Sequence, residues 1–450
     1  MSTVFFILFT LAEITLVVLT FTGFSEKTAW LKNRTLIRTI ETFLLFVMVL
    51  VPATHMKWRY AAALTVLFIR LLISCIAWIV NRKKAQGRRG KAVTVVSCIF
   101  SIIFMVILLT PAFIFTNYNG LPTTGEYEIN QVEAILVDEN RTDPFENDGS
   151  FREVPAHFFY PKNTNDSFPL VIFSHGAFGY YQSNYSTYAE LASHGYIVVA
   201  LDHPHHSFFT TDTSGAAVIV DTNFINDVMR INDIESEEET FMLSHEWLKL
   251  RTDDENFVLD IIIDAAKSRS LNSAWNTDDA DTISKVVAEI DIDKIGLFGH
   301  SLGGATSVSL GRERKDVDAV IVLDGTMLGE RTEVEDGKYV YYNEPYPVPI
   351  LDFTKANDYN EREQYKSENG YPYVNEYVID NANDGRTVIF SNAEHMDFTD
   401  LPLISPFLAS ILGSGDIDHE EMMNKVNGIV LNWFDYYLKN EGTLDIQANY

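Results

Sequence analysis

The strongest chemical signal in the chain is the segment 295–306, in which Gly299-His300-Ser301-Leu302-Gly303 fits the pattern G-x-S-x-G. An apolar strand precedes this pattern, and a helix of small residues follows it. That order predicts a sharp strand-to-helix turn, where the two glycines remove colliding side chains and the serine hydroxyl stands clear of the sheet. The first amides of the helix then point at the place where negative charge develops. We interpret Ser301 as a nucleophile.

A serine hydroxyl becomes a good nucleophile only when a histidine accepts its proton and a carboxylate orients that histidine. His395 follows the last predicted strand, where serine hydrolases of this layout carry their histidine. His419 is the only later histidine, and we expect it at the surface because it lies beside acidic residues. Asp324 and Asp352 each end a predicted strand. Position along the chain allows either one to be the acid.

A second loop with chemical potential is His175-Gly176-Ala177, which follows another apolar strand. A glycine in such a loop lets backbone amides turn inward. We therefore expect the amides of Ala177 and Leu302 to form an oxyanion hole. The side chains that we expect to line the substrate pocket are His175, Phe178, His203 and Met327.

The loop Asp202-His203-Pro204-His205-His206 invites comparison with a metal site, because two of its histidines are two residues apart. A hydrolytic metal site needs further ligands at matching spacing, and this loop lacks them. We expect no metal and no cofactor. The loop is expected to line the rim of the pocket.

Short apolar runs that alternate with helical patterns predict a mostly parallel, doubly wound sheet. The predicted strands are 126–137, 156–160, 170–173, 196–201, 294–298, 319–323, 349–353 and 387–390, and the predicted helices are 185–193, 246–266 and 422–438. Residues 208–244 show no clean period, so we expect an insertion at about 205–245 that caps the site. Its acidic run, Glu235–Glu239, is expected on a solvated face.

The N-terminal region is predicted to span a membrane. Residues 4–24, 61–80 and 92–115 are apolar runs long enough to cross a bilayer. A fourth run, 35–51, has charges near its start. The first residues lack a basic leader and a small-residue cleavage site, so we expect no removable signal peptide.

Two charged residues, Arg70 and Glu13, lie inside these apolar runs. A charge within a membrane is costly unless it is paired. We interpret them as an interhelical ion pair, with Glu41 as the alternative partner of Arg70, rather than as an ion or substrate path.

Basic residues indicate the orientation, because positively charged loops stay in the cytoplasm. They crowd the link between the last two runs: Arg82, Lys83, Lys84, Arg88, Arg89 and Lys91. Four spans would also place the basic first link in the cytoplasm, which favours four spans over three. We therefore expect a multi-pass region at 1–116, a linker at 117–125 and an extracytoplasmic catalytic domain at 126–450.

Charge divides the chain in the same way. The 450 residues carry a formal charge of -28, yet residues 1–116 hold 13 basic and 3 acidic residues, and the remainder holds 21 basic and 59 acidic ones. A domain that acidic excludes nucleic acid as a partner. Both cysteines, Cys75 and Cys98, lie in the apolar part, so the acidic part contains no disulfide. We take this as a sign of a bacterial surface.

Several motifs together resemble a known family. They are Phe-Ser-His-Gly at 173–176, the serine motif at 299–306, Val-Leu-Asp-Gly at 322–325 and Glu-His-Met-Asp-Phe at 394–398, with looser matches at 141–144, 247–260 and 415–418. Over about residues 130–440 the chain resembles the plasma-type (group VII) platelet-activating-factor acetylhydrolases and their bacterial relatives within the α/β-hydrolases. The N-terminal helices and residues 208–244 depart from the family pattern.

The resemblance implies an α/β-hydrolase fold and selects Asp324, because this family carries its acid one strand earlier than most α/β-hydrolases. It also implies calcium-independent hydrolysis of esters with short or oxidised acyl chains, often on phospholipids. We expect a membrane-anchored serine ester hydrolase that acts on a small-molecule or lipid ester. The alternatives are an acyltransferase with the same triad, and a membrane receptor or transporter subunit with a retired hydrolase domain. The sequence makes no prediction of oligomeric state.

Overall fold

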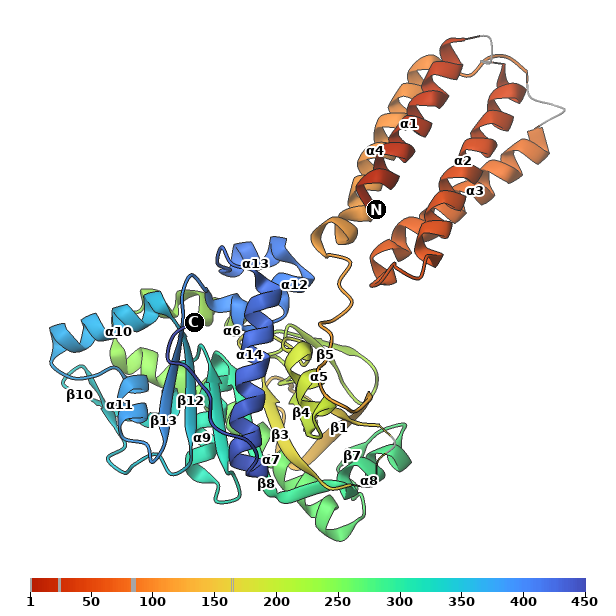
Figure 1. Ribbon diagram of the computed structural model, residues 1–450. Helices are drawn as coiled ribbons and strands as arrows, with labels where there is room; N and C mark the ends of the chain where they lie inside the picture. The colour runs from red at the N-terminus through yellow and green to blue at the C-terminus, as the bar shows by residue number, and fades with distance from the viewer. Residues whose placement is uncertain (1, 23–25, 82–85, 163, 165) are drawn as a thin grey trace. The chain divides into compact units, whose positions relative to one another are not determined.

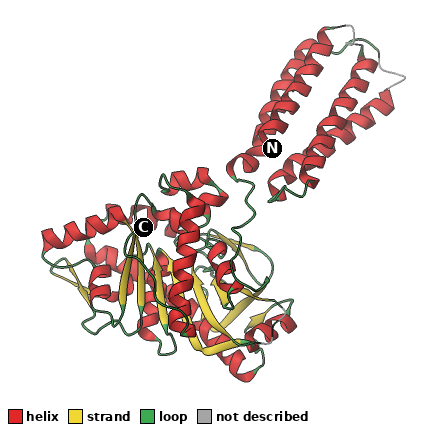
Figure 2. Ribbon diagram, viewed as in Figure 1, coloured by secondary structure: helices red, strands yellow, loops and turns green. Residues whose placement is uncertain are grey.

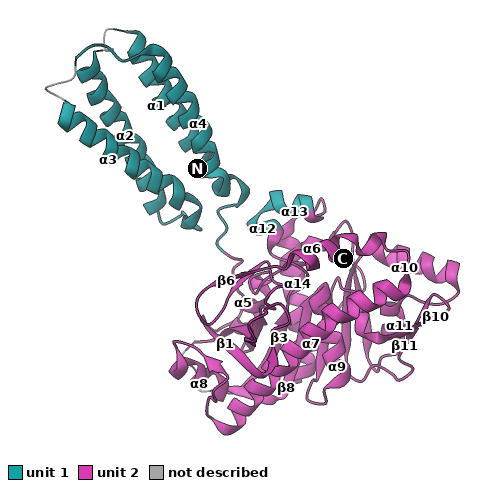
Figure 3. Ribbon diagram, turned by 180° about the vertical axis from the view of Figure 1, so that it is seen from behind, with its two compact units in different colours: residues 1–119, 402–411 teal, residues 120–401, 412–450 magenta. Residues whose placement is uncertain are grey.

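A computed structural model describes residues 2–22, 26–81, 86–162, 164 and 166–450, and the chain forms two compact units (Figure 3). Unit 1 contains residues 1–119 and 402–411, and unit 2 contains residues 120–401 and 412–450. The first boundary falls inside the segment 117–125, for which the sequence predicts a linker.

Four long helices build unit 1: α1 (Ser2–Phe21), α2 (Lys27–Leu50), α3 (Ala61–Asn81) and α4 (Lys91–Ile114), with a short 3-10 helix, Lys57–Tyr60, leading into α3 (Figure 1). Among the described residues, three helical segments are long and apolar enough to cross a membrane: Ser2–Phe21, Lys57–Asn81 and Lys91–Ile114. Helix α2 is as long, but its first half carries several charges. Of the predicted basic loop, Arg82, Lys83 and Lys84 lie outside the described residues.

The charged residues inside these helices pair with one another. Glu13 accepts hydrogen bonds from Arg70 and, at 2.8 Å, from Arg38. Arg38 also pairs with Glu41 at 2.6 Å. Both carboxylates are almost fully buried. The predicted pair of Arg70 with Glu13 is confirmed, and Arg38 extends it to a network of four side chains.

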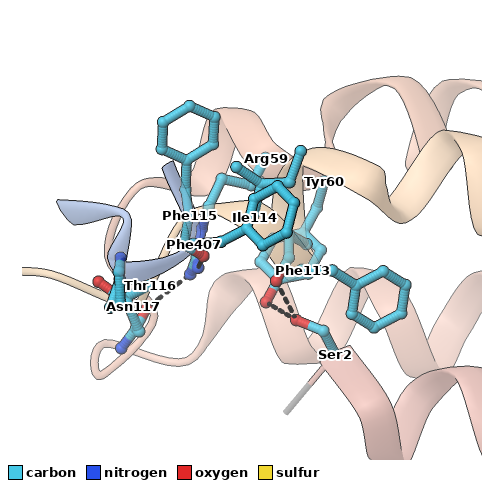
Figure 4. Close-up of a pocket in the computed structure, with 11 residues that line it drawn as sticks. Ser2, Arg59, Tyr60, Phe113, Ile114, Phe115, Thr116, Asn117 and Phe407 are labelled. Atoms are coloured by element: carbon cyan, nitrogen blue, oxygen red, sulfur yellow. Dashed lines mark hydrogen bonds between the residues drawn. The ribbon is translucent and has the colours of Figure 1, made fainter. Parts of the chain in front are cut away.

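The segment 402–411 extends unit 1 beside the end of α4. It includes parts of two short helices, α12 (Leu401–Ile404) and α13 (Pro406–Leu412). The Ser405 hydroxyl donates to the Ile114 carbonyl at 2.9 Å, and the Thr116 N–H donates to the Ile404 carbonyl at 2.8 Å. A cavity of about 510 Å³ lies here, and Figure 4 shows Ser2, Tyr60 and Phe407 among its lining residues.

A nine-stranded sheet forms the centre of unit 2 (Figure 2). Its spatial order is β13-β12-β9-β8-β3-β4-β2-β1-β7, with parallel pairing from β13 to β4 and antiparallel pairing from β4 to β7. The strands of this sheet are β1 (Ile129–Thr142), β2 (Phe151–Pro161), β3 (Phe168–Ser174), β4 (Ile197–Leu201), β7 (Trp275–Asn276), β8 (Ile290–His300), β9 (Ala319–Leu323), β12 (Ile350–Lys355) and β13 (Gly385–Phe390).

Helices cover both faces of the sheet, because its parallel strands are apolar on both sides. One face packs against α7 (Glu237–Ser268), α8 (Ala280–Ala288), α9 (Leu302–Glu313) and α11 (Val374–Asp380). The opposite face packs against α5 (Tyr185–Ser193) and α14 (His419–Phe434). Figure 1 shows α14 in front of the sheet. Figure 3, turned by 180°, shows α7 and α9 on the opposite face. The predicted doubly wound fold is confirmed.

The remaining elements are peripheral. A hairpin of β10 (Arg331–Glu335) and β11 (Lys338–Tyr341) follows β9, and α10 (Ala356–Asn369) follows β12. The insertion contains a second hairpin, β5 (Phe209–Thr211) with β6 (Ala217–Ile219), followed by α6 (Thr222–Arg230).

The helix that follows the insertion begins earlier than the sequence predicts. Helix α7 begins at Glu237 instead of 246, so Glu237, Glu238 and Glu239 of the acidic run lie in the first turn of this 32-residue helix. The Ser236 hydroxyl accepts a hydrogen bond from the Glu239 N–H and caps the helix. Carboxylates are favourable at a helix N-terminus because the exposed amides there carry partial positive charge.

Candidate active site

Ser301 occupies the turn between β8 and α9, and its backbone is strained. Its φ is 54° and its ψ is -121°, a combination that a non-glycine residue adopts only when its surroundings enforce it. The Ser301 N–H donates to the Leu323 carbonyl at 2.9 Å. A Cβ at Gly303 would lie 1.9 Å from the Ser174 carbonyl oxygen, so only glycine fits there. The turn has the geometry that the G-x-S-x-G pattern predicts.

Asp324 and His395 face each other across the carboxyl edge of the sheet. His395 Nδ1 donates to Asp324 Oδ2 at 2.7 Å. The Asp324 side chain is almost fully buried, whereas His395 is about one-third exposed. Burial favours the neutral acid, but the hydrogen bond and charge of His395 hold the pKa of Asp324 below its usual value. Asp324 is therefore a carboxylate when it accepts from the imidazole.

The other candidate acid, Asp352, has different partners. Its oxygens accept from Asn375 Nδ2 at 3.2 Å and from Arg362 Nη1 at 3.3 Å. Burial raises the pKa of Asp352 to about 7. The structure therefore pairs His395 with Asp324, the residue that the family resemblance selects.

Local contacts fix the His395 loop. Glu394 and Asp397 form a capping box around the 3-10 helix His395–Phe398, and Asp397 also accepts from the Gly415 N–H at 2.7 Å. His419 lies 3.2 Å from Asp397 and is only partly exposed, rather than at the open surface.

His300 supports the His395 loop through a hydrogen bond to its backbone. Burial and the neighbouring His395 lower the pKa of His300 to about 3, so its ring is neutral. Its Nε2–H donates to the backbone carbonyl of His395 at 3.0 Å. Sequence reasoning missed this role, although His300 lies inside the serine motif.

The predicted oxyanion loop lies directly against Ser301. A Cβ placed on Gly176 would be 3.2 Å from Ser301 Cβ and 2.7 Å from His300 Nδ1. Among the hydrogen bonds of the described residues, none uses the Ala177 N–H. The Leu302 amide is in the first turn of α9, where helical amides lack partners within the helix.

Arg251, on α7, bonds the backbone of this loop. Its fully buried guanidinium donates to the His175 carbonyl and, at 3.3 Å, to the Gly176 carbonyl. Burial lowers the pKa of Arg251 to about 9, so it stays charged at neutral pH. In a trans peptide the carbonyl and the next N–H point in opposite directions. Fixing the Gly176 carbonyl therefore fixes the Ala177 N–H.

The histidine loop is buried rather than at a rim. His203 has no exposed surface, and it bonds Ser174 Oγ at 2.9 Å and Asp254 Oδ2 at 3.1 Å. Asp254 is also paired with the fully buried Arg152 at 2.8 Å. The sequence predicted that this loop lines the rim of the pocket. It could not show that Asp254 and Arg152, which are distant in sequence, contact the loop and bury it.

Of the other predicted pocket residues, two are buried away from the pocket and one lies beside it. His175 is fully buried and bonds Ser207 Oγ at 2.7 Å, and Met327 belongs to the sheet core. Only Phe178 packs in the apolar cluster next to Ala177 and Leu302. Phe224 of α6 and Trp247 of α7, which sequence reasoning did not assign to the pocket, also belong to that cluster.

The sheet order, the strand-to-helix turn (the elbow) at Ser301 and the loops at the carboxyl ends of the strands define an α/β-hydrolase fold. Solved structures agree on this fold. A ferulic acid esterase from Streptomyces cinnamoneus superposes with a TM-score of 0.51 and 20% identity, covering 72% of this chain and 95% of the esterase.

The chain belongs to the family described as platelet-activating factor acetylhydrolase, isoform II, whose family model matches residues 149–447. The predicted family resemblance is confirmed. The platelet-activating factor acetylhydrolase of Bos taurus is 30% identical over 217 residues, 47% of this chain and 44% of the bovine protein. That of Cavia porcellus is 25% identical over 302 residues, 65% of this chain and 63% of the guinea-pig protein. The matches thus span less than two thirds of these relatives.

Proposed function

We propose that this protein is a serine ester hydrolase in which Ser301, His395 and Asp324 form the catalytic triad. The observation that carries the proposal is the hydrogen bond between His395 and Asp324 beside a serine held at positive φ. Family membership supports it, because the family's name denotes hydrolysis of an acetyl ester.

In this proposal His395 Nε2 takes the proton of Ser301 as the hydroxyl attacks the acyl carbon, and Asp324 stabilises the imidazolium that forms. The amides of Ala177 and Leu302 hold the negative oxygen of the tetrahedral intermediate. His395 then returns the proton to the leaving alcohol, and water hydrolyses the acyl-enzyme by the same steps.

The substrate we propose is an ester with a short acyl chain, including short or oxidised acyl chains on phospholipids. Phe178, Phe224 and Trp247 pack beside the oxyanion residues, with ring centroids 5.4 Å and 5.5 Å apart. We propose that the acyl group packs against this aromatic cluster; the preference for a short chain rests on the family's name, which denotes removal of an acetyl group.

We also propose that the chain is anchored in a membrane by four spans, with residues 126–450 on the extracytoplasmic side. Three apolar helices and the paired charges inside unit 1 support membrane anchoring, and α2, a helix of 24 residues, would supply the fourth span. The proposed layout is a multi-pass region at 1–116, a linker at 117–125 and a catalytic domain with its cap at about 205–245, in a bacterial membrane.

The test is hydrolysis of p-nitrophenyl esters from acetate to laurate by the full-length protein in detergent. We expect kcat/KM to be highest for the shortest acyl chains and to fall as the chain lengthens. A phospholipid with an acetyl group at its second position should be cleaved faster than its palmitoyl counterpart. Absence of turnover with every ester would contradict the hydrolase, and a rise towards laurate would contradict the short-acyl pocket.

A further inference from the structure

Unit 1 contains a polar cavity of about 200 Å³ among its four long helices. Its walls include the guanidinium groups of Arg34, Arg38, Arg70 and Arg89 and a single carboxylate, Glu13. It lies towards the end of the bundle where α1 leads into α2 and α3 leads into α4. Charged groups inside membrane helices are costly and usually mark a functional site.

Two of the four arginines are neutralised and two are not. Arg38 and Arg70 pair with Glu13 and Glu41. Among the described residues, Arg34 and Arg89 form no ion pair; Arg34 donates to the Ser74 hydroxyl at 2.9 Å. The cavity therefore carries two uncompensated positive charges.

Three residues that line this cavity each carry a buried donor with no acceptor within the described part of the chain. They are Arg34 Nη2, Arg89 Nε and the indole Nε1 of Trp30, whose side chain is 5% exposed. Both guanidinium groups lie over the Trp30 ring, at 5.1 Å and 4.6 Å from its centroid. Buried donors nearly always have a partner in native proteins, so three of them on residues that line one cavity indicate a ligand that accepts.

We propose that this cavity binds a phosphate group. Guanidinium groups match phosphate oxygens in pairs, and two free positive charges match a phosphate monoester dianion. Of the hydroxyls on the wall, those of Ser97 and Ser101 can donate to the remaining oxygens, Ser101 while it accepts from Arg70; the Thr94 hydroxyl donates to the Gly90 carbonyl. The group comes either from the headgroup of an anionic phospholipid, as in basic pockets between membrane helices, or from free phosphate.

The test is calorimetric titration of the purified full-length protein with two probes. One is an ether-linked phosphatidic acid, which an esterase cannot cleave, and the other is inorganic phosphate. We expect Arg34→Gln and Arg89→Gln each to weaken binding about tenfold or more, because each removes a charge-assisted hydrogen bond. Trp30→Phe, which keeps the ring and removes the N–H, should weaken binding by a smaller factor. Binding of the lipid alone identifies a headgroup site, and binding of both probes identifies a site for free phosphate.

The matched control is Arg88→Gln, an exposed arginine next to Arg89 that does not line the cavity. It should change binding less than about twofold. Without ligand, Arg34→Gln should melt at the same temperature as the wild type or higher, because it relieves repulsion between like charges. The proposal is overturned if neither probe binds the folded protein. It is equally overturned if Arg88→Gln weakens binding as much, or if Arg34→Gln lowers ligand-free stability and leaves binding intact.

Discussion

Two aspartates at neighbouring strand ends differ in their hydrogen-bond partners, and this difference predicts different roles for them. Asp324 bonds His395, whereas Asp352 bonds Asn375 and Arg362. Asp324→Asn should lower kcat by about 10⁴-fold, because the amide favours the wrong imidazole tautomer. Asp352→Asn should cost about tenfold or less. Ester turnover by folded variants of matched melting temperature measures both, and the reverse ranking would move the acid to Asp352.

Asp352 also predicts a dependence of stability on pH. Burial raises its pKa from 3.8 to about 7, so the folded protein keeps a proton that the unfolded chain releases. The stability contributed by this group is present below pH 3.8 and is lost as the pH rises to about 7. Asp352→Asn stays neutral at every pH. We expect its free energy of unfolding, relative to wild type, to increase from pH 4 to pH 8 in urea titrations. A difference that shrinks over this range would contradict the assignment.

At the scale of elements, α7 supports the site through one buried side chain. Arg251 helps to fix the Gly176 carbonyl, which also accepts from His175 Nδ1 and the Gly179 N–H, and with it the Ala177 amide. Arg251→Lys keeps the charge but loses the planar guanidinium that donates to both loop carbonyls. We expect kcat to fall about 10- to 100-fold while KM changes little, because the oxyanion forms only on the way to the transition state. Lys249→Met, which removes an exposed cation of the same helix, is the control and should leave both constants unchanged. An equal effect of both variants, or an effect confined to KM, would contradict the positioning role.

Sequence patterns predicted the elements that are defined locally. Apolar runs located the parallel strands, and the glycines of the serine motif located the elbow, because both depend on neighbouring residues. The start of α7 was missed although Ser236 and Glu239 have capping spacing, since the acidic run was interpreted as a solvated face. His203 and Arg251 were misplaced or missed because their partners are distant in sequence.

At the scale of the whole molecule, two units of opposite charge predict a definite topology. Protease added to spheroplasts should digest residues after Asn117. The basic link that includes Arg88 and Arg89 keeps the N-terminal end of α4 in the cytoplasm, so the chain that follows the C-terminal end of α4 lies outside. A tag inserted at Gly87 should stay protected until the membrane is permeabilised. Protection of the catalytic domain, or digestion of the tag, would reverse the proposed orientation.

The most direct test of the central claim is covalent labelling of the nucleophile. Full-length protein treated with a fluorophosphonate probe should carry one adduct, which mass spectrometry of peptides should place on Ser301. Ser301→Ala should abolish labelling and reduce ester turnover by several orders of magnitude, because the triad acts as a unit. The control is Ser307→Ala, a buried serine on α9 whose hydroxyl bonds the Gly303 carbonyl, and it should still label. Labelling that survives in Ser301→Ala, or an adduct on another residue of the wild type, would contradict the account.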